Sequence, residues 1–250
     1  MSTPFLATES VTKRFGDFTA VRNVSMTFGQ GELTAIIGPN GAGKSTYFNL
    51  LTGAFPPSEG KILFEGQDIT GIPQHRFVHL GIAKSFQITN VFPQLSVFEN
   101  VRLAAQALVT GLELWRPRGS YTALADTADR VLAQVGLLDR RRELAARLSH
   151  GEQRALEVGM ALAAEPRLLL LDEPTAGMSP EETRGMMDLI VRLAAERTVI
   201  LVEHKMKLVM SICQRILVLH QGEVLAAGAP DEVRRDDQVR RVYLGQRAAA

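Results

Sequence analysis

The sequence predicts an α/β fold: a parallel sheet flanked by helices, with a small antiparallel β region and a helical subdomain inserted at about residues 90–155. Continuous apolar runs at Leu168–Leu171, Thr198–Val202 and Ile216–Leu219 alternate with helical stretches. Such runs are typical of parallel strands that are buried on both faces. From about Val97 to Arg147 the chain is rich in Ala and Leu and has a helical pattern. We therefore expect a sheet core that is interrupted by helices.

The other predicted elements follow in chain order. Glu32–Ile37 is predicted as a short strand that runs into a glycine-rich segment, and Lys44–Thr52 as the helix after it. Lys61–Phe64 and a short segment a few residues later are predicted to form a hairpin. The segment Leu114–Tyr121 breaks the helical pattern with Trp, Pro and Gly, which predicts an exposed loop. A Gln-Gly turn signal precedes Glu223–Ala226, which is therefore expected to pair with the strand before it.

The composition excludes several classes of protein. Of the 250 residues, 46% are hydrophobic, which is enough for a sizeable core in a single domain of residues 1–250. The formal net charge is +1, so the excess of Lys and Arg that binds nucleic acid is missing. The single cysteine, Cys213, excludes an internal disulfide and favours a reduced, cytosolic compartment. Met1–Ser10 has no secretory pattern, and the apolar runs are far shorter than the ~20 residues that cross a bilayer. We expect no nucleic-acid partner and no direct membrane insertion.

The most informative segment fits the P-loop pattern and stands between a predicted strand and a predicted helix. It reads Gly38-Pro39-Asn40-Gly41-Ala42-Gly43-Lys44-Ser45-Thr46. Its glycines allow the backbone to wrap around phosphates, and its N–H groups and the helix N-terminus favour negative charge. Lys44 can reach the β- and γ-phosphates of ATP, and the hydroxyl of Ser45 can bind Mg²⁺. The alternative is a glycine-rich turn that only caps a helix.

A pair of acids ends the apolar run at Leu168–Leu171. Carboxylates at the end of a parallel strand lie at the mouth of the sheet, where ligands bind. Asp172 would hold Mg²⁺, and Glu173 would act as the general base toward the attacking water. The alternative is a solvated acidic strand end.

A third segment, Leu148–Gln153, carries the pattern of a capped helix start. Ser149 is the predicted N-cap and Glu152 its capping-box partner. With Gly151 in the first turn, this N-terminus is also a candidate anion site for a phosphate.

In this order, the three segments resemble the Walker A, signature and Walker B sequences of ABC transporter ATPases, and the resemblance covers about residues 5–230. It implies that Gln87 contacts Mg²⁺ and the transmembrane partner. It further implies that His204 senses the γ-phosphate, that Phe15 stacks on adenine, and that Thr175–Pro180 forms the D-loop. The alternatives are that Gln87 is an ordinary loop amide, that His204 caps a helix and that Phe15 is a core aromatic. Cys213 shares an apolar helical face with Met206, Val209 and Met210, which predicts that these side chains pack in the core.

Three residues depart from the family pattern. His150 replaces a glycine of the signature, which bears on how tightly phosphate is held. Ser179 stands where the D-loop has aspartate, which questions the hydrogen bond between subunits. Lys205 follows the switch histidine where an acid is common, and it either tunes His204 or is solvated.

A closer resemblance is to the ATPases of branched-chain amino-acid importers of the LivG type. The matching stretches are Ile82–Gln87, Ala176–Pro180 and His204–Met210. The resemblance implies a second ATPase subunit, two permeases and a substrate-binding protein as partners, and a cytoplasmic place on the inner face of the membrane. In this interpretation ATP lies between two subunits related by a two-fold axis, and Gln87 with the residues up to about Val97 forms a groove for a permease helix.

Several alternatives stay open at this stage. Related importers of urea or amides and a lipopolysaccharide exporter are broadly similar. A soluble ABC ATPase that acts without permeases, a P-loop kinase and a nucleotide-binding scaffold are the other classes. The transported substrate contacts the permeases, so the sequence of this chain does not define it.

Overall fold

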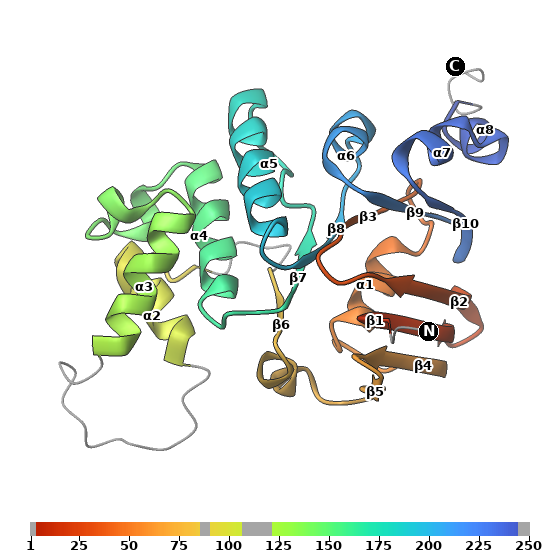
Figure 1. Ribbon diagram of the computed structural model, residues 1–250, viewed down its shortest axis with the longest axis horizontal. Helices are drawn as coiled ribbons and strands as arrows, with labels where there is room; N and C mark the ends of the chain where they lie inside the picture. Colours follow the sequence, from red (N-terminus) through yellow and green to blue (C-terminus); the bar gives the residue numbers. More distant parts are fainter. Residues whose placement is uncertain (1–3, 86–90, 107–121, 245–250) are drawn as a thin grey trace.

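The computed structural model describes residues 4–85, 91–106 and 122–244 (Figure 1). Within them, a mostly parallel sheet has the strand order β10-β9-β3-β8-β7-β6. Its strands are β3 (Leu33–Ile37), β6 (Ile82–Lys84), β7 (Leu168–Asp172), β8 (Thr198–Val202), β9 (Arg215–His220) and β10 (Glu223–Gly228). Only β10 runs antiparallel to its neighbour among these six. The predicted parallel sheet and the hairpin at its edge are confirmed.

A second, antiparallel sheet of the described chain has the order β2-β1-β4-β5. It consists of β1 (Leu6–Phe15), β2 (Phe18–Phe28), β4 (Glu59–Phe64) and β5 (Gln67–Asp68). The predicted hairpin corresponds to β4 and β5. This sheet lies beside helix α1 (Lys44–Leu51), on the right in Figure 1.

The central strands are buried over their whole length because both faces of the parallel sheet are covered. In β3, Leu33, Ala35 and Ile37 belong to one hydrophobic cluster, together with α5 (Pro180–Ala194) and the helical region. Ile36 points the other way, into the cluster that contains α1 and the antiparallel sheet. The period-two alternation of a strand thus divides one apolar run between two cores. Three more helices of the described chain follow α5 along the sheet, namely α6 (Met206–Ile212), α7 (Pro230–Arg235) and α8 (Asp237–Leu244). Helix α6 packs against β3 and α5, α7 against β9 and β10, and α8 against β10.

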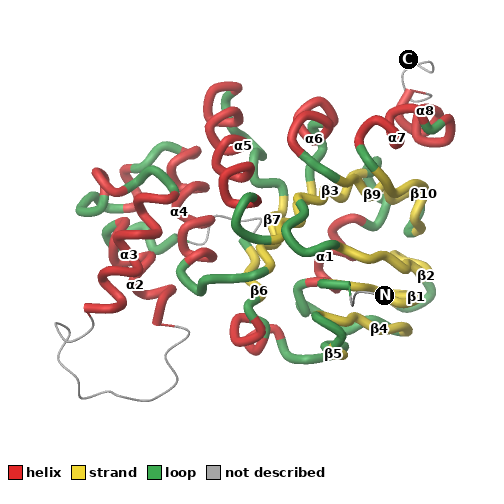
Figure 2. The backbone as a smooth tube through the Cα atoms, viewed as in Figure 1, coloured by secondary structure: helices red, strands yellow, loops and turns green. Residues whose placement is uncertain are grey.

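The helical region contains α2 (Val97–Ala105), α3 (Thr122–Gln134) and α4 (His150–Leu162), as Figure 2 shows. Short 3₁₀ turns lie at Leu138–Arg140 and Ala145–Arg147. The helical subdomain is expected to end at about residue 155, whereas α4 continues to Leu162. Leu156, Val158 and Leu162 in its second half are buried in the same core as α3. The predicted loop at Leu114–Tyr121 lies outside the described residues.

Other predicted ends shift by one or two residues. Glu32 precedes β3 instead of starting it, because its carboxylate accepts a hydrogen bond from the N–H of Gly29 at 2.9 Å. Thr52 is the C-cap of α1 and not its last residue. Strand β10 continues two residues beyond the predicted Ala226. In the described part of the chain, no helix combines the length and the apolar character needed to cross a membrane.

Candidate active site

The P-loop segment joins β3 to α1, as its sequence predicts. Gly43, the N-cap of α1, has a left-handed backbone with φ 92°. A Cβ at this position would lie 2.5 Å from the carbonyl oxygen of Ala20 in β2. Gly43 is therefore required both by its backbone angle and by the close approach of another strand. The loop is a cradle of main-chain groups at the N-terminus of a helix, which suits phosphate.

Lys44 lies inside this cradle and is only 6% exposed. Its ammonium donates hydrogen bonds to the carbonyl oxygens of Gly38 and Pro39, each at 2.9 Å. Burial lowers the pKa of Lys44, and the negative charges of Glu173 and Asp172 oppose that shift. The loop lysine and the acidic strand end are thus close enough to influence each other, although about 130 residues separate them in the sequence.

A cavity of about 220 Å³ borders the loop. It is lined by Gly41–Thr46 together with Phe18 and Ala20 of β2. Phe18 is 66% exposed, and no motif in the sequence marks it as a residue of the site. Phe15 is 49% exposed, so the alternative of a core aromatic is wrong. Its ring meets Phe55 edge-on at 5.6 Å, and its stacking on adenine stays a prediction.

Asp172 ends β7 and is only 4% exposed, so it is no solvated strand end. Its Oδ1 atom is buried and has no hydrogen-bond partner among the described residues. Burial is the main cause that raises the pKa of Asp172, Glu173 adds to the rise, and Lys84 opposes it. An unsatisfied buried carboxylate oxygen fits a site for a cation. The described residues contain no cluster of three or more His, Cys, Asp or Glu side chains for a metal. Asp172 could therefore hold a cation only together with other oxygen donors.

Glu173 and His204 form the next part of the site. Oε1 of Glu173 and Nε2 of His204 are 2.5 Å apart. Glu173 has a left-handed backbone with φ 48°, and its N–H donates to the carbonyl oxygen of Val202 at the end of β8. The alternative that His204 caps a helix is wrong, because Lys205 is the N-cap of α6 and the imidazole contacts Glu173 instead. The arrangement joins a carboxylate to an imidazole at the mouth of the sheet.

The structure shows what the three residues that depart from the family pattern contact. Lys205 donates from Nζ to the carbonyl oxygen of Thr175 at 3.2 Å and to the hydroxyl of Thr183 at 3.1 Å, so its ammonium is not simply solvated. Ser179 is the N-cap of α5. The imidazole of His150 lies against Gly177, where an added Cβ would be 3.3 Å from the ring.

The capping box predicted for α4 is present, with the hydroxyl of Ser149 accepting from the N–H of Glu152 at 3.2 Å. The anion at this helix start is a carboxylate of the same chain. Oε1 of Glu182 in α5 accepts from the N–H of Gly151 at 3.0 Å and from the Ser149 hydroxyl at 3.3 Å. These bonds, after the stronger one from the N–H of Ser179, lower the pKa of Glu182. The pattern Ser179-x-x-Glu182 signals a capping box but not this second contact. Gln87 lies outside the described residues.

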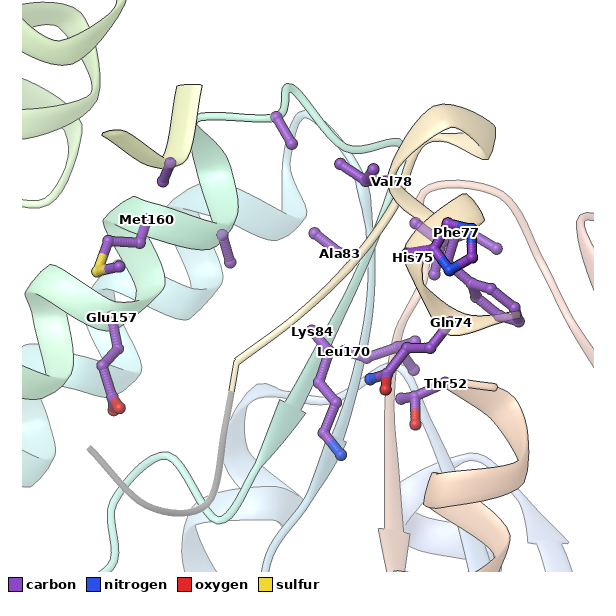
Figure 3. A pocket seen from close by; sticks show the side chains of 14 residues that line it. Thr52, Gln74, His75, Phe77, Val78, Ala83, Lys84, Glu157, Met160 and Leu170 are labelled. Carbon is purple, nitrogen blue, oxygen red and sulfur yellow. The ribbon is translucent and has the colours of Figure 1, made fainter. Parts of the chain in front are cut away.

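A groove of about 470 Å³ lies between the helical region and β6, next to the 3₁₀ turn Gln74–Arg76 (Figure 3). Its lining is mostly apolar, with Phe77, Met160 and Leu170 among the residues drawn. Lys84 of β6 and Glu157 of α4 add polar groups to the lining. Lys84 reaches Oδ1 of Asn49 in α1 at 2.9 Å, which connects the groove to the core of the site.

The strand order gathers these parts at one edge of the sheet. A P-loop follows β3, an acidic pair ends β7 and a histidine follows β8. This arrangement defines a P-loop nucleotide-binding protein.

The chain belongs to the ABC transporter family, whose model matches residues 21–176. A second model, described as a branched-chain amino acid ATP-binding cassette transporter, matches residues 223–249. The high-affinity branched-chain amino acid transport ATP-binding protein LivG of Salmonella typhimurium is 40% identical, over 98% of this chain and all of the relative. The lipopolysaccharide export system ATP-binding protein LptB of Haemophilus influenzae is 33% identical, over 96% of this chain and 97% of the relative.

Solved structures agree with this assignment. The ADP conformation of an ATP-binding cassette of an ABC transporter matches with a TM-score of 0.86 at 30% identity, over 97% of this chain and 99% of that one. A dimeric post-hydrolysis cassette bound to ADP and phosphate matches with a TM-score of 0.75 at 27% identity, over 90% of this chain and 98% of that one. The predicted family, fold class and ATPase activity are confirmed: the chain is an ATP-binding cassette that hydrolyses ATP. This excludes the kinase and the pure scaffold.

Proposed function

We propose that the chain is the ATP-hydrolysing subunit of an importer of branched-chain amino acids. The observation that carries this proposal is the full-length similarity to LivG, with 40% identity, together with the family model at residues 223–249. The exporter relative LptB is less similar, at 33% identity. Import therefore has the better support of the two directions.

ATP would bind with its phosphates in the cradle of residues Gly38 to Thr46. The main-chain N–H groups and the start of α1 would face the β- and γ-phosphates, and the ammonium of Lys44 would turn from its carbonyl partners toward them. The cavity beside the loop and the exposed rings of Phe15 and Phe18 support a place for the base at the end of the antiparallel sheet.

A Mg²⁺ ion bound with the nucleotide would neutralise part of the phosphate charge. The residues that would hold it are Ser45, through its hydroxyl, Asp172, through the buried oxygen that lacks a partner, and Gln87. Mg²⁺ usually binds proteins through one or two carboxylates, here that of Asp172, while phosphate oxygens and water fill much of the coordination shell.

Glu173 would accept the proton of the water that attacks the γ-phosphate. His204 would hold the carboxylate of Glu173 in place, and its imidazole would lie beside the γ-phosphate. The contact of 2.5 Å between Nε2 of His204 and Oε1 of Glu173 supports this division of roles, because it brings an imidazole and a carboxylate together at the mouth of the sheet.

A second ATPase subunit would complete the site. In one copy, α4 packs against α2, α3, α5 and β6, whereas α1 packs against β2 and β8. The capped start of α4, with Ser149, Gly151 and Glu152, would therefore face a nucleotide held by the neighbouring subunit. Closing on that nucleotide requires the carboxylate of Glu182 to leave Gly151, because two anions cannot share these donors.

Permease subunits would dock into the groove of Figure 3. Its mixed lining, apolar with Lys84 and Glu157 at its sides, suits a short amphipathic helix. Because that groove is linked through Lys84 to α1, a permease segment would sense the state of the nucleotide. The chain would then work in the cytoplasm on the inner face of the membrane, and a substrate-binding protein would take part indirectly.

The test is uptake of labelled leucine, isoleucine and valine by cells in which this chain is replaced by Glu173→Gln. We expect uptake to fall to the level of a deletion, while the wild-type chain restores it. Uptake of all three amino acids at the wild-type rate in the deletion would contradict the proposed substrate class. ATP hydrolysis by the purified chain, measured in parallel, separates a wrong substrate from a wrong mechanism.

A further inference from the structure

A buried glutamate, Glu203, directly precedes His204 and reaches across to the segment that follows Glu173. It directly follows β8 and is only 3% exposed. Its N–H donates to the carbonyl oxygen of Ile36 in β3 at 3.4 Å. Removing a carboxylate from water is costly unless hydrogen bonds compensate for the lost hydration. The hydrogen bonds that compensate Glu203 therefore identify the segments that this side chain connects.

Both carboxylate oxygens of Glu203 accept hydrogen bonds from the two flanking segments. Oε1 accepts from the N–H of Thr175 at 3.2 Å and from the Thr175 hydroxyl at 2.5 Å. Oε2 accepts from the N–H of His204 at 3.0 Å and from the N–H of Lys205 at 3.4 Å. Thr175 lies two residues beyond Glu173, so this one side chain ties the backbone next to each member of the Glu173–His204 pair.

Lys205 adds a second tie between the same segments. Its ammonium donates to the carbonyl oxygen of Thr175 and to the hydroxyl of Thr183 in α5. Thr175 is fully buried. Its N–H and hydroxyl donate to Glu203, and its carbonyl oxygen accepts from Lys205.

We infer that Glu203 is a positioning residue for ATP hydrolysis, which fixes the turns after β7 and β8 so that the imidazole of His204 meets the carboxylate of Glu173. The inference rests on the roles proposed above for Glu173 and His204. Glu203 itself does not act on water, because it is buried and each of its oxygens already accepts two hydrogen bonds.

The test is the variant Glu203→Gln in the full chain, assayed with Mg²⁺ and ATP. An amide of nearly the same size has one oxygen and one NH₂ group, so the NH₂ group must face N–H donors on one of the two sides. Toward His204 and Lys205 it loses both hydrogen bonds, and toward Thr175 it loses the bond from the N–H while the hydroxyl can turn to accept from it. We expect kcat to fall about tenfold or more, because small displacements of reacting groups reduce rates by this order. KM for ATP and the affinity for a non-hydrolysable analogue should stay within about twofold, because the carboxylate of Glu203 has no hydrogen bond to the P-loop, which supplies most of the proposed contacts with ATP.

A matched control and a second variant keep the test decisive. Glu32→Gln removes a carboxylate that also accepts a main-chain N–H, but at the opposite end of β3, and it should leave kcat unchanged. Thr175→Val deletes only the hydroxyl that contacts Glu203, and kcat should fall less than in Glu203→Gln, again at constant KM. If Glu203→Gln does not fold, Thr175→Val decides the question by the same criteria.

An unchanged kcat in the deciding variant would overturn the inference. So would a parallel loss of kcat, ATP affinity and thermal stability, since that pattern belongs to a merely structural residue. The proposed function has its own readout: if Glu173→Gln or His204→Ala hydrolyses ATP normally, the roles assigned to those residues fail. If both are inactive while Glu203→Gln is not, only the role of Glu203 fails.

Discussion

Replacing Gly43 by alanine should destabilise the nucleotide-free protein far more than the same change at Gly41. Both residues lie in the P-loop and have left-handed backbones, with φ 92° at Gly43 and φ 78° at Gly41. An alanine in that region costs about 1–2 kcal/mol at either position. At Gly43 the new Cβ would also lie 2.5 Å from the carbonyl oxygen of Ala20 and 3.3 Å from Cα of Gly222. At Gly41 no described atom lies within 4 Å.

The overlap at Gly43 forces the loop or β2 to move, and such overpacking adds about 1–3 kcal/mol. We therefore expect Gly43→Ala to lose about 2 kcal/mol more of the free energy of unfolding than Gly41→Ala. Urea unfolding of both variants without nucleotide measures the difference, because bound ligand would otherwise add its own stabilisation. Equal losses in the two variants, with unchanged slopes in urea, would refute the steric argument and leave only the backbone angle.

Three further predictions follow from the site and its surroundings. Glu173→Gln should bind ATP, lose about 100-fold or more in hydrolysis because the proposed general base is gone, and form an ATP-dependent dimer on size-exclusion chromatography. Hydrolysis at the wild-type rate would contradict the role proposed for Glu173. Glu182→Gln should bring the ATP concentration for that dimer, measured in the Glu173→Gln background, below the value of the parent, because the carboxylate no longer competes at Gly151. The matched control is Glu181→Gln, in the same turn, whose side chain has no hydrogen bond or ion pair to any described residue. It should leave that concentration unchanged, and a shift as large as that of Glu182→Gln would show that net charge alone is responsible. Burial raises the pKa of the Cys213 thiol to about 12, so the thiol stays neutral at neutral and mildly alkaline pH and should react with a maleimide only as the chain unfolds; rapid labelling of the native protein at pH ~8 would contradict this.

Most of the fold could be predicted because its signals are local. The apolar runs of β7, β8 and β9 are continuous, and only strands covered on both faces have this pattern. The end of the helical region could not be predicted, because the second half of α4 mixes Ala, Gly and Met with a few large apolar residues. What extends that helix to Leu162 is packing against α3, and the sequence of α4 does not contain this information.

The site divides in the same way. The P-loop and the capping box of α4 are recognised from consecutive residues, since spacing along one segment defines them. Glu203 and Glu182 were missed because each acts on a segment about 30 residues away, Glu203 on Thr175 and Glu182 on Gly151. A carboxylate beside a histidine, or in the first turn of a helix, looks like ordinary local structure until the fold supplies its second partner.

The strand order explains why these distant contacts converge. Strand β8 lies between β3 and β7, although both come earlier in the chain. The segment after β8 therefore lies between the P-loop and the acidic strand end, and it is tied to both sides: the N–H of Glu203 bonds to β3, and its carboxylate bonds to Thr175 beyond β7. His204 on this segment contacts Glu173, and it would face the γ-phosphate that we propose at the P-loop, because the insertion of β8 places it there. Any change that loosens β8 from either neighbour should therefore affect hydrolysis before it affects the binding of ATP, because the P-loop itself is formed by β3, α1 and their contacts with β2.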